Sequence, residues 1–260
     1  MTYAYLPGPQ QSNVDIQMIK GQAIAGCAIG ILVLDLWYPY VPGNVANGST
    51  FDFPVLFKIL RGTKKEPNKE HKILSADPAL LDSILEAGEE LERQGVRAIV
   101  GACGYFANYQ SEAAKRINVP TFLSSILQIP IILRGLKPKQ KVGIICGDGP
   151  SLTPNLLGQC GVEDLSRVAI IGAEKGLEFQ KLINSIGHFN SYKIEQELIA
   201  LAKELVSKNP EVGAILLECS DMPPYAWAIQ NAVKLPVFDF ISLINWVYYG
   251  VVRRPFAGFI

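Results

Sequence analysis

The chain has 260 residues, 49% of them hydrophobic, and its 24 basic and 24 acidic side chains give a formal net charge of zero. This balance excludes the strongly basic surface that nucleic-acid or anionic-membrane binding requires, so neither is an expected partner. The length is sufficient for one large domain or two small ones with a substantial core.

The cysteines and the N-terminus indicate a soluble cytoplasmic protein. The five cysteines are an odd number without a CxxC pair, which favours reduced thiols over a disulfide framework. The first residues lack a basic segment and a cleavage signature of an exported protein. The apolar run 23–36 is too short to span a bilayer.

Strand and helix patterns alternate along the chain and predict an α/β protein with parallel sheets. Residues 1–28 are expected to form an N-terminal extension, and packing of this extension against a neighbouring subunit of a homo-oligomer is left open. Residues 29–136 are predicted to form a first lobe, which the C-terminal segment 238–260 joins. Residues 137–237 are predicted to form the second lobe, with the stretch 137–140 as the boundary between the lobes.

Within this pattern, residues 29–36 form a buried strand, followed by a loop rich in aromatic residues and turn formers. Residues 51–60 fit a strand or a short helix. A helix is expected from Asp77, as N-cap, to about residue 94, and another from Gly104 to residue 116. The second lobe repeats the order with a strand at 141–146, helices at 152–159 and 194–208, and a last helix at 241–251.

An internal duplication relates the two lobes. Residues 96–122 and 212–238 align at an offset of 116 without a gap and share seven identical residues, among them Cys103 with Cys219. Chance would give about one or two identities at average composition. Each half therefore carries one thiol directly after an apolar strand.

That position has a chemical meaning. In open parallel sheets the carboxyl ends of the strands form the ligand-binding crevice. A following helix offers free N–H groups to a carboxylate and is expected to lower the pKa of a thiol beside it. Two thiols facing each other across one cleft could remove a proton from one side of a carbon atom and return one to the other.

The residues around both cysteines resemble the aspartate/glutamate/hydantoin racemase superfamily. The resemblance is carried by 101–107 (GACGYFA), 217–225 (LECSDMPPY) and 235–239 (LPVFD). It implies two similar Rossmann-like or flavodoxin-like lobes related by a pseudo-twofold axis, with the active site between them. It also implies racemisation or epimerisation at the α-carbon of a small amino acid or carbonyl acid, without cofactor or metal.

The resemblance further implies roles for particular residues. Cys103 and Cys219 are the expected acid/base pair. Substrate contacts with a carboxylate or carbonyl are expected from eight other residues: Asp35, Trp37, Tyr38, Gly104, Tyr105, Thr153, Ser220 and Asp221. If side chains alternate along the strand, Glu218 points away from Cys219. It is then expected to contact other site residues and not the substrate.

Several alternatives remain open at this level. Members of the superfamily with two cysteines include cis-trans isomerases of the maleate isomerase type, and those with one cysteine include malonate decarboxylases, which the second cysteine disfavours here. A two-lobe binding protein without catalysis and a redox dithiol are further alternatives. Asp221 and the aromatic loop make glutamate a poor substrate.

Overall fold

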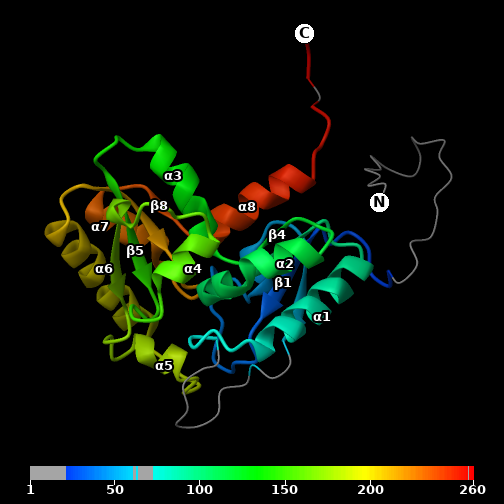
Figure 1. The fold of residues 1–260 in the computed structure, drawn as a ribbon, viewed down its shortest axis with the longest axis horizontal. Helices are drawn as coiled ribbons and strands as arrows, with labels where there is room; N and C mark the ends of the chain where they lie inside the picture. The colour runs from blue at the N-terminus through cyan, green and yellow to red at the C-terminus, as the bar shows by residue number, and fades with distance from the viewer. Residues whose placement is uncertain (1–21, 61–62, 64–72, 257) are drawn as a thin grey trace.

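A computed structural model describes residues 22–60, 63, 73–256 and 258–260 (Figure 1). Most of the predicted N-terminal extension lies outside the described residues. Where its last residues are described, they run without regular structure up to the first strand. In the part of the chain covered by these ranges, no helix is long and apolar enough to cross a bilayer.

The first sheet has four parallel strands in the order β2-β1-β3-β4. Its strands are β1 (Ile29–Val33), β2 (Val55–Ile59), β3 (Ala98–Gly101) and β4 (Thr121–Phe122). Every residue of β1 and β3 is buried, because helices or loops cover both faces of a parallel sheet. The ambiguous segment 51–60 resolves as strand β2 at the sheet edge.

The second sheet repeats this arrangement with the order β6-β5-β7-β8, again all parallel. Its strands are β5 (Lys141–Cys146), β6 (Val168–Gly172), β7 (Val212–Leu217) and β8 (Val237–Phe238). The two sheets have the same strand order, because β1 to β4 correspond to β5 to β8 in turn. The predicted α/β class, the two parallel sheets and their duplication are therefore confirmed.

Eight α-helices connect and cover the strands. They are α1 (Ala79–Arg93), α2 (Gln110–Arg116), α3 (Ile129–Gly135), α4 (Pro154–Gln159), α5 (Phe179–Ile183), α6 (Ser191–Lys208), α7 (Ala226–Val233) and α8 (Phe240–Val251) in the described residues. In Figure 1, α1 lies on the outer side of the first lobe and α6 and α7 on the outer side of the second. Helix α1 buries Leu80, Ile84 and Leu91 on one face, the amphipathic stripe that its sequence predicts.

The last helix returns to the first lobe. Phe240, Leu243, Ile244 and Val247 of α8 belong to the same buried cluster as Ile29 and Ile31 of β1. A capping box fixes the helix start, with Asp239 and Ser242 exchanging hydrogen bonds. The boundaries placed at residues 28, 136 and 237 remain predictions.

The predicted helix starts differ from those in the structure. Helices α4, α6 and α8 begin at Pro154, Ser191 and Phe240 instead of residues 152, 194 and 241. The segment after Cys103 begins as a 3₁₀ helix, Gly104–Tyr109, and becomes α-helical only at Gln110. The helix expected from Asp77 begins at Ala79, whose backbone N–H donates to the Asp77 carboxylate. Helix ends commonly differ by one or two residues between definitions, but the 3₁₀ turn changes how backbone donors surround Cys103.

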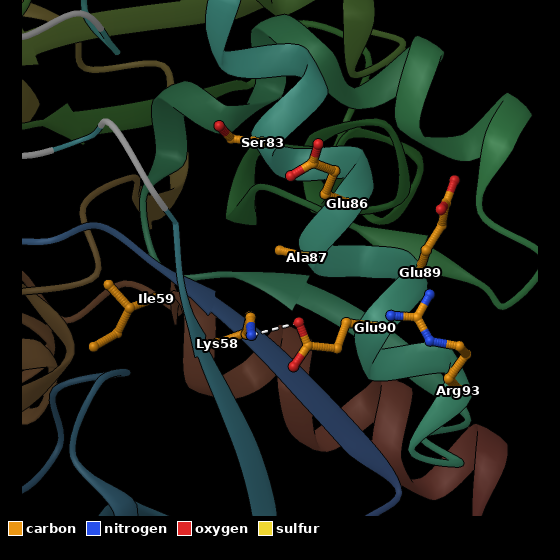
Figure 2. Close-up of a pocket in the computed structure, with 8 residues that line it drawn as sticks. All are labelled: Lys58, Ile59, Ser83, Glu86, Ala87, Glu89, Glu90 and Arg93. Atoms are coloured by element: carbon orange, nitrogen blue, oxygen red, sulfur yellow. Dashed lines mark ion pairs between the residues drawn. The ribbon is translucent and has the colours of Figure 1, made fainter. Parts of the chain in front are cut away.

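A surface hollow lies between β2 and α1, away from both sequence-predicted cysteines. Figure 2 shows Lys58 of β2 paired with Glu90 of α1, with Glu86, Glu89 and Arg93 along the same helix. Six of its eight residues are charged or polar, and the Lys58–Glu90 pair is partly exposed, where an ion pair contributes little free energy. None of them lines the cavity described next.

Candidate active site

The loops that carry the two cysteines are tied together directly. Cys103 follows β3 and Cys219 follows β7, each two residues after the strand ends. The hydroxyl of Ser220, beside Cys219, donates to the carbonyl of Ala102, beside Cys103, at 2.8 Å. Both thiols line one cavity between the lobes. The duplicated strands thus bring both cysteines to a single site.

The cavity is small, mostly apolar and acidic. Its space is about 90 Å³, well below the roughly 300–1,000 Å³ typical of sites for drug-sized ligands, so only a small molecule fits. Among the described residues that line it there is no lysine, arginine or histidine. The lining residues are Val33, Leu34, Leu36, Tyr38, Tyr40, Asn44, Ala46, Ile73, Leu74, Ala102, Cys103, Tyr105, Gly147, Asp148, Leu182, Ile183, Cys219, Ser220 and Asp221.

Asp221 is the best-connected polar group in the cavity. The hydroxyl of Tyr38 donates to its two carboxylate oxygens at 2.8 and 3.0 Å, and the side-chain amide of Asn44 also donates to it. The Cys219 thiol lies 3.6 Å from Oδ2 and donates to it. Burial raises the pKa of Asp221, while these three donors oppose that rise. The site is therefore built to hold this carboxyl group in one orientation.

The pKa values of both thiols are raised, contrary to the expectation that they are lowered. Burial is the main cause that raises the pKa of Cys103, followed by the nearby Glu218 carboxyl. Burial and Asp221 raise the pKa of Cys219. The backbone N–H groups of Tyr105 and Phe106 at the 3₁₀ turn lower the pKa of Cys103, but burial outweighs them. A positive charge from outside the chain would favour the thiolate.

Six of the residues predicted as substrate contacts or acid/base groups line the same cavity. Tyr38, Tyr105, Ser220 and Asp221 line the cavity with the two cysteines. Tyr105 also exchanges hydrogen bonds with the backbone of Asp148 across the lobes, at 2.6 and 2.7 Å. Their roles toward a substrate remain predictions.

Four other predicted contacts lie outside the cavity lining. Trp37 is 70% exposed and donates to the Asp35 carboxylate at 2.8 Å, and neither residue lines the cavity. Thr153 caps α4 by accepting from the Leu156 N–H. Gly104 lies behind Cys103, against Glu218.

The structure adds residues that the sequence reading did not select. Tyr40 and Asn44 come from the aromatic loop after β1, whose turn formers were a general signal for this region. Asp148 follows β5 at the position equivalent to that loop in the second lobe. Leu182 and Ile183 come from α5, and no sequence pattern marked that helix as part of a site.

Comparison with known proteins identifies sequence relatives of one activity. Dimethylsulfoniopropionate lyase 5 of Emiliania huxleyi (strain CCMP1516) is 30% identical over 238 residues, which is 89% of this chain and 47% of that protein. Dimethylsulfoniopropionate lyase of Durusdinium sp. clade D is 27% identical over 244 residues, or 92% of this chain and 80% of that protein. The chain spans 47% to 61% of the length of lyases 5, 3 and 6 of Emiliania huxleyi.

Solved structures identify the fold. A glutamate racemase from Bacillus anthracis superposes with a TM-score of 0.53 at 12% identity, covering 86% of this chain and 82% of that one. No family model matches the chain. The molecule shares the two-lobe fold of this glutamate racemase and of an allantoin racemase from Klebsiella pneumoniae, which is the fold that the resemblance around the cysteines implied.

The predicted activity is wrong. A racemase or epimerase was expected, with an isomerase of the maleate type as an alternative, but the relatives at up to 30% identity over 89% of the chain are named as lyases. The physical reason is that a fold positions two thiols without fixing the reaction, which depends on the other groups in the cavity. The isomerase assignment is therefore withdrawn.

Proposed function

We propose that this chain is a dimethylsulfoniopropionate lyase. Its substrate would carry a sulfonium cation at one end and a carboxylate at the other, and the products would be dimethyl sulfide and acrylate. The single observation that carries the proposal, beyond the relatives' names, is the cavity with two thiols and carboxyl groups and no cationic side chain among its described lining. Such a cavity complements a cation.

Asp221 is the proposed partner of the sulfonium group. A buried carboxylate is costly unless an opposite charge or hydrogen-bond donors compensate it. Tyr38 and Asn44 supply donors, and a sulfonium cation would supply the charge. Tyr38 and Tyr40 line the same cavity, and aromatic rings attract cations that carry methyl groups.

The apolar part of the wall suits the two methyl groups and the reaction itself. Leucine and isoleucine side chains from both lobes form it, among them Leu36, Ile73 and Leu182. The elimination starts from an anionic base and a cationic substrate and ends with neutral groups at both positions. A surrounding of low polarity favours this loss of charge, because it stabilises separated charges poorly.

Cys103 is the proposed base. Two backbone N–H groups, from Tyr105 and Phe106, lower the pKa of its sulfur, which is the arrangement that a thiolate needs. The thiolate removes a proton from the carbon next to the substrate carboxylate. The electron pair of that C–H bond forms the double bond of acrylate, and the C–S bond breaks with its electrons on sulfur to give neutral dimethyl sulfide. The Cys103 proton then passes to solvent.

Cys219 has a different part in this proposal. Its thiol donates to Asp221 and so stays protonated while Asp221 bears the negative charge. Because the described lining holds no cationic side chain and its hydroxyls already donate to protein acceptors, the proposed donors to the substrate carboxylate are the backbone N–H groups after the two cysteines. The duplicated thiols thus have unequal roles, as a reaction with one proton transfer requires.

The test is incubation of the purified chain with dimethylsulfoniopropionate, with dimethyl sulfide measured by headspace gas chromatography and acrylate by NMR. Cys103→Ser should abolish turnover, and Cys219→Ser should reduce it mainly through substrate binding. Cys27→Ser, a half-buried cysteine outside the cavity, is the matched control and should be unaffected. A folded wild-type chain that releases neither product would refute the proposal.

A further inference from the structure

Glu218 is a buried carboxyl group that the proposed reaction does not use. It lies between β7 and Cys219 and is fully buried. Its Oε2 accepts from the backbone N–H of Gly147 at 3.1 Å, within the second lobe. Its Oε1 is buried and has no hydrogen-bond partner among the described residues. Buried polar atoms without a partner are rare in folded proteins, so this oxygen needs an explanation.

The unpartnered oxygen crosses into the first lobe beside Cys103. A Cβ atom at Gly104 would lie 1.9 Å from Oε1 and 2.4 Å from the carboxyl carbon. No side chain fits at position 104 while Glu218 is in place. The absence of a side chain next to the thiol therefore makes room for a carboxyl group from the other lobe.

The charged side chains that act on Glu218 are all acidic. Asp148 and Asp221 raise its pKa, and Glu218 in turn acts on four further acids. These are Cys103, Tyr105, Cys146 and Cys219. Burial is the main cause, and it raises the pKa of Glu218 to about 8, whereas the Gly147 N–H lowers it. Near pH 7 the carboxyl group is mostly protonated and neutral.

Among the ionisable groups, Glu218 has the largest effect on the pKa of Cys103. After burial, it makes the largest contribution to the raised pKa of Cys103, ahead of Asp221. A neutral Glu218 removes this opposition and leaves an O–H donor on the side of the Cys103 loop. An ionised Glu218 opposes a second negative charge on the neighbouring sulfur.

We propose that Glu218, reaching across the lobe boundary into the space left by Gly104, is a positioning residue for Cys103 that permits thiolate formation only while it carries a proton. The inference rests on the proposed function, in which Cys103 is the base. It assigns the buried acid a role in the reaction without contact with the substrate. It also gives a reason for the close approach of the two lobes at this point.

The first experiment compares the pH dependence of dimethyl sulfide release in the wild type, Glu218→Gln and Glu174→Gln. Glutamine keeps the shape and an oxygen for the Gly147 N–H but cannot ionise. Above pH 8, the activity of Glu218→Gln should rise relative to that of the wild type. The increase should be up to about tenfold for each pKa unit that ionised Glu218 adds to the pKa of Cys103. Glu174, which accepts from the Gly149 N–H outside the cavity, is the control and should follow the wild type.

A second readout does not depend on turnover. Methyl methanethiosulfonate, a small uncharged reagent, modifies thiolates, and mass spectrometry of the Cys103 peptide gives its rate at each pH. Modification should rise more steeply above pH 8 in Glu218→Gln than in the wild type. If Glu218→Gln does not fold, Glu218→Asp, which withdraws the charge from Gly104, takes its place.

The outcomes separate the two proposals. Parallel pH profiles of the wild type and Glu218→Gln, for both turnover and Cys103 modification, would overturn the role of Glu218. A wild type without lyase activity would overturn the proposed function, and the modification rates would still decide whether Glu218 controls the Cys103 thiol.

Discussion

The hydroxyl of Tyr38 in the first lobe donates to the carboxylate of Asp221 in the second at 2.8 Å. Asn44, from the same loop after β1, donates to the same group. One acid beside Cys219 is therefore oriented by the opposite lobe. The geometry of the cavity depends on this contact as much as on the two duplicated strands.

Removal of that hydroxyl should weaken both the fold and substrate binding. Tyr38→Phe leaves the buried Asp221 without one donor, which should cost about 1–3 kcal/mol in the free energy of unfolding and raise KM. Urea denaturation and steady-state kinetics measure the two effects. Tyr40→Phe is the control, because the Tyr40 hydroxyl donates to the Leu36 carbonyl instead. Equal effects of both substitutions would contradict a specific role of the Tyr38–Asp221 bond.

The charge of Asp221 should matter for a cationic ligand and much less for a neutral one. Asp221→Asn keeps the shape but removes the negative charge, so KM for dimethylsulfoniopropionate should rise by roughly tenfold or more, the value of a charged hydrogen bond. Inhibition by 3-(methylthio)propionate, which lacks the sulfonium charge, should change little. The surface variant Asp164→Asn provides the comparison. A similar loss for both ligands would argue against an ion pair at Asp221.

Glu218 should make stability depend on pH. Its pKa is raised from the ordinary 4.5 to about 8 in the folded chain. The folded state therefore holds a proton that the unfolded state releases between these values, so the free energy of unfolding falls as pH rises from about 4.5 to 8 and levels off above. The loss is on the order of several kcal/mol.

The check is urea denaturation at pH 5 and pH 8. Asp221 and Asp239 also have raised pKa values and contribute in the same direction, so the informative quantity is the difference between the wild type and Glu218→Gln. The variant should show the shallower fall. The same fall in both proteins would mean that Glu218 is ionised in the folded state at neutral pH.

The close approach of Gly104 and Glu218 predicts a strong coupling between the two positions. Gly104→Ala alone should be destabilising, because its Cβ meets the Glu218 carboxyl. Combined with Glu218→Ala, which removes that carboxyl, the same substitution should cost less, with a coupling energy of about 0.5–3 kcal/mol. A double-mutant cycle by denaturation measures it. Gly135→Ala, in a position with open space, is the reference substitution, and strict additivity at 104 and 218 would disprove the contact.

Much of the architecture follows from the linear pattern. Continuous apolar runs such as 29–33 and 212–217 are typical of strands that are buried on both faces of a parallel sheet. The duplication that aligns Cys103 with Cys219 places each thiol just after such a strand. Local rules sufficed there, because strand burial and helix periodicity act over neighbouring residues. The reaction class did not follow, since racemase-like and lyase-like sites share this framework.

The sequence by itself determined the duplicated α/β fold and the placement of one thiol after a strand in each lobe. Only the tertiary structure decided that Tyr38 points at Asp221 while Trp37 faces solvent, that Thr153 serves a helix cap, and that Glu218 reaches Gly104. It also decided that the pKa values of both thiols are raised, because burial outweighs the backbone donors. Hydrophobic periodicity is encoded locally, whereas side-chain direction, burial and charge coupling arise only when two distant segments meet.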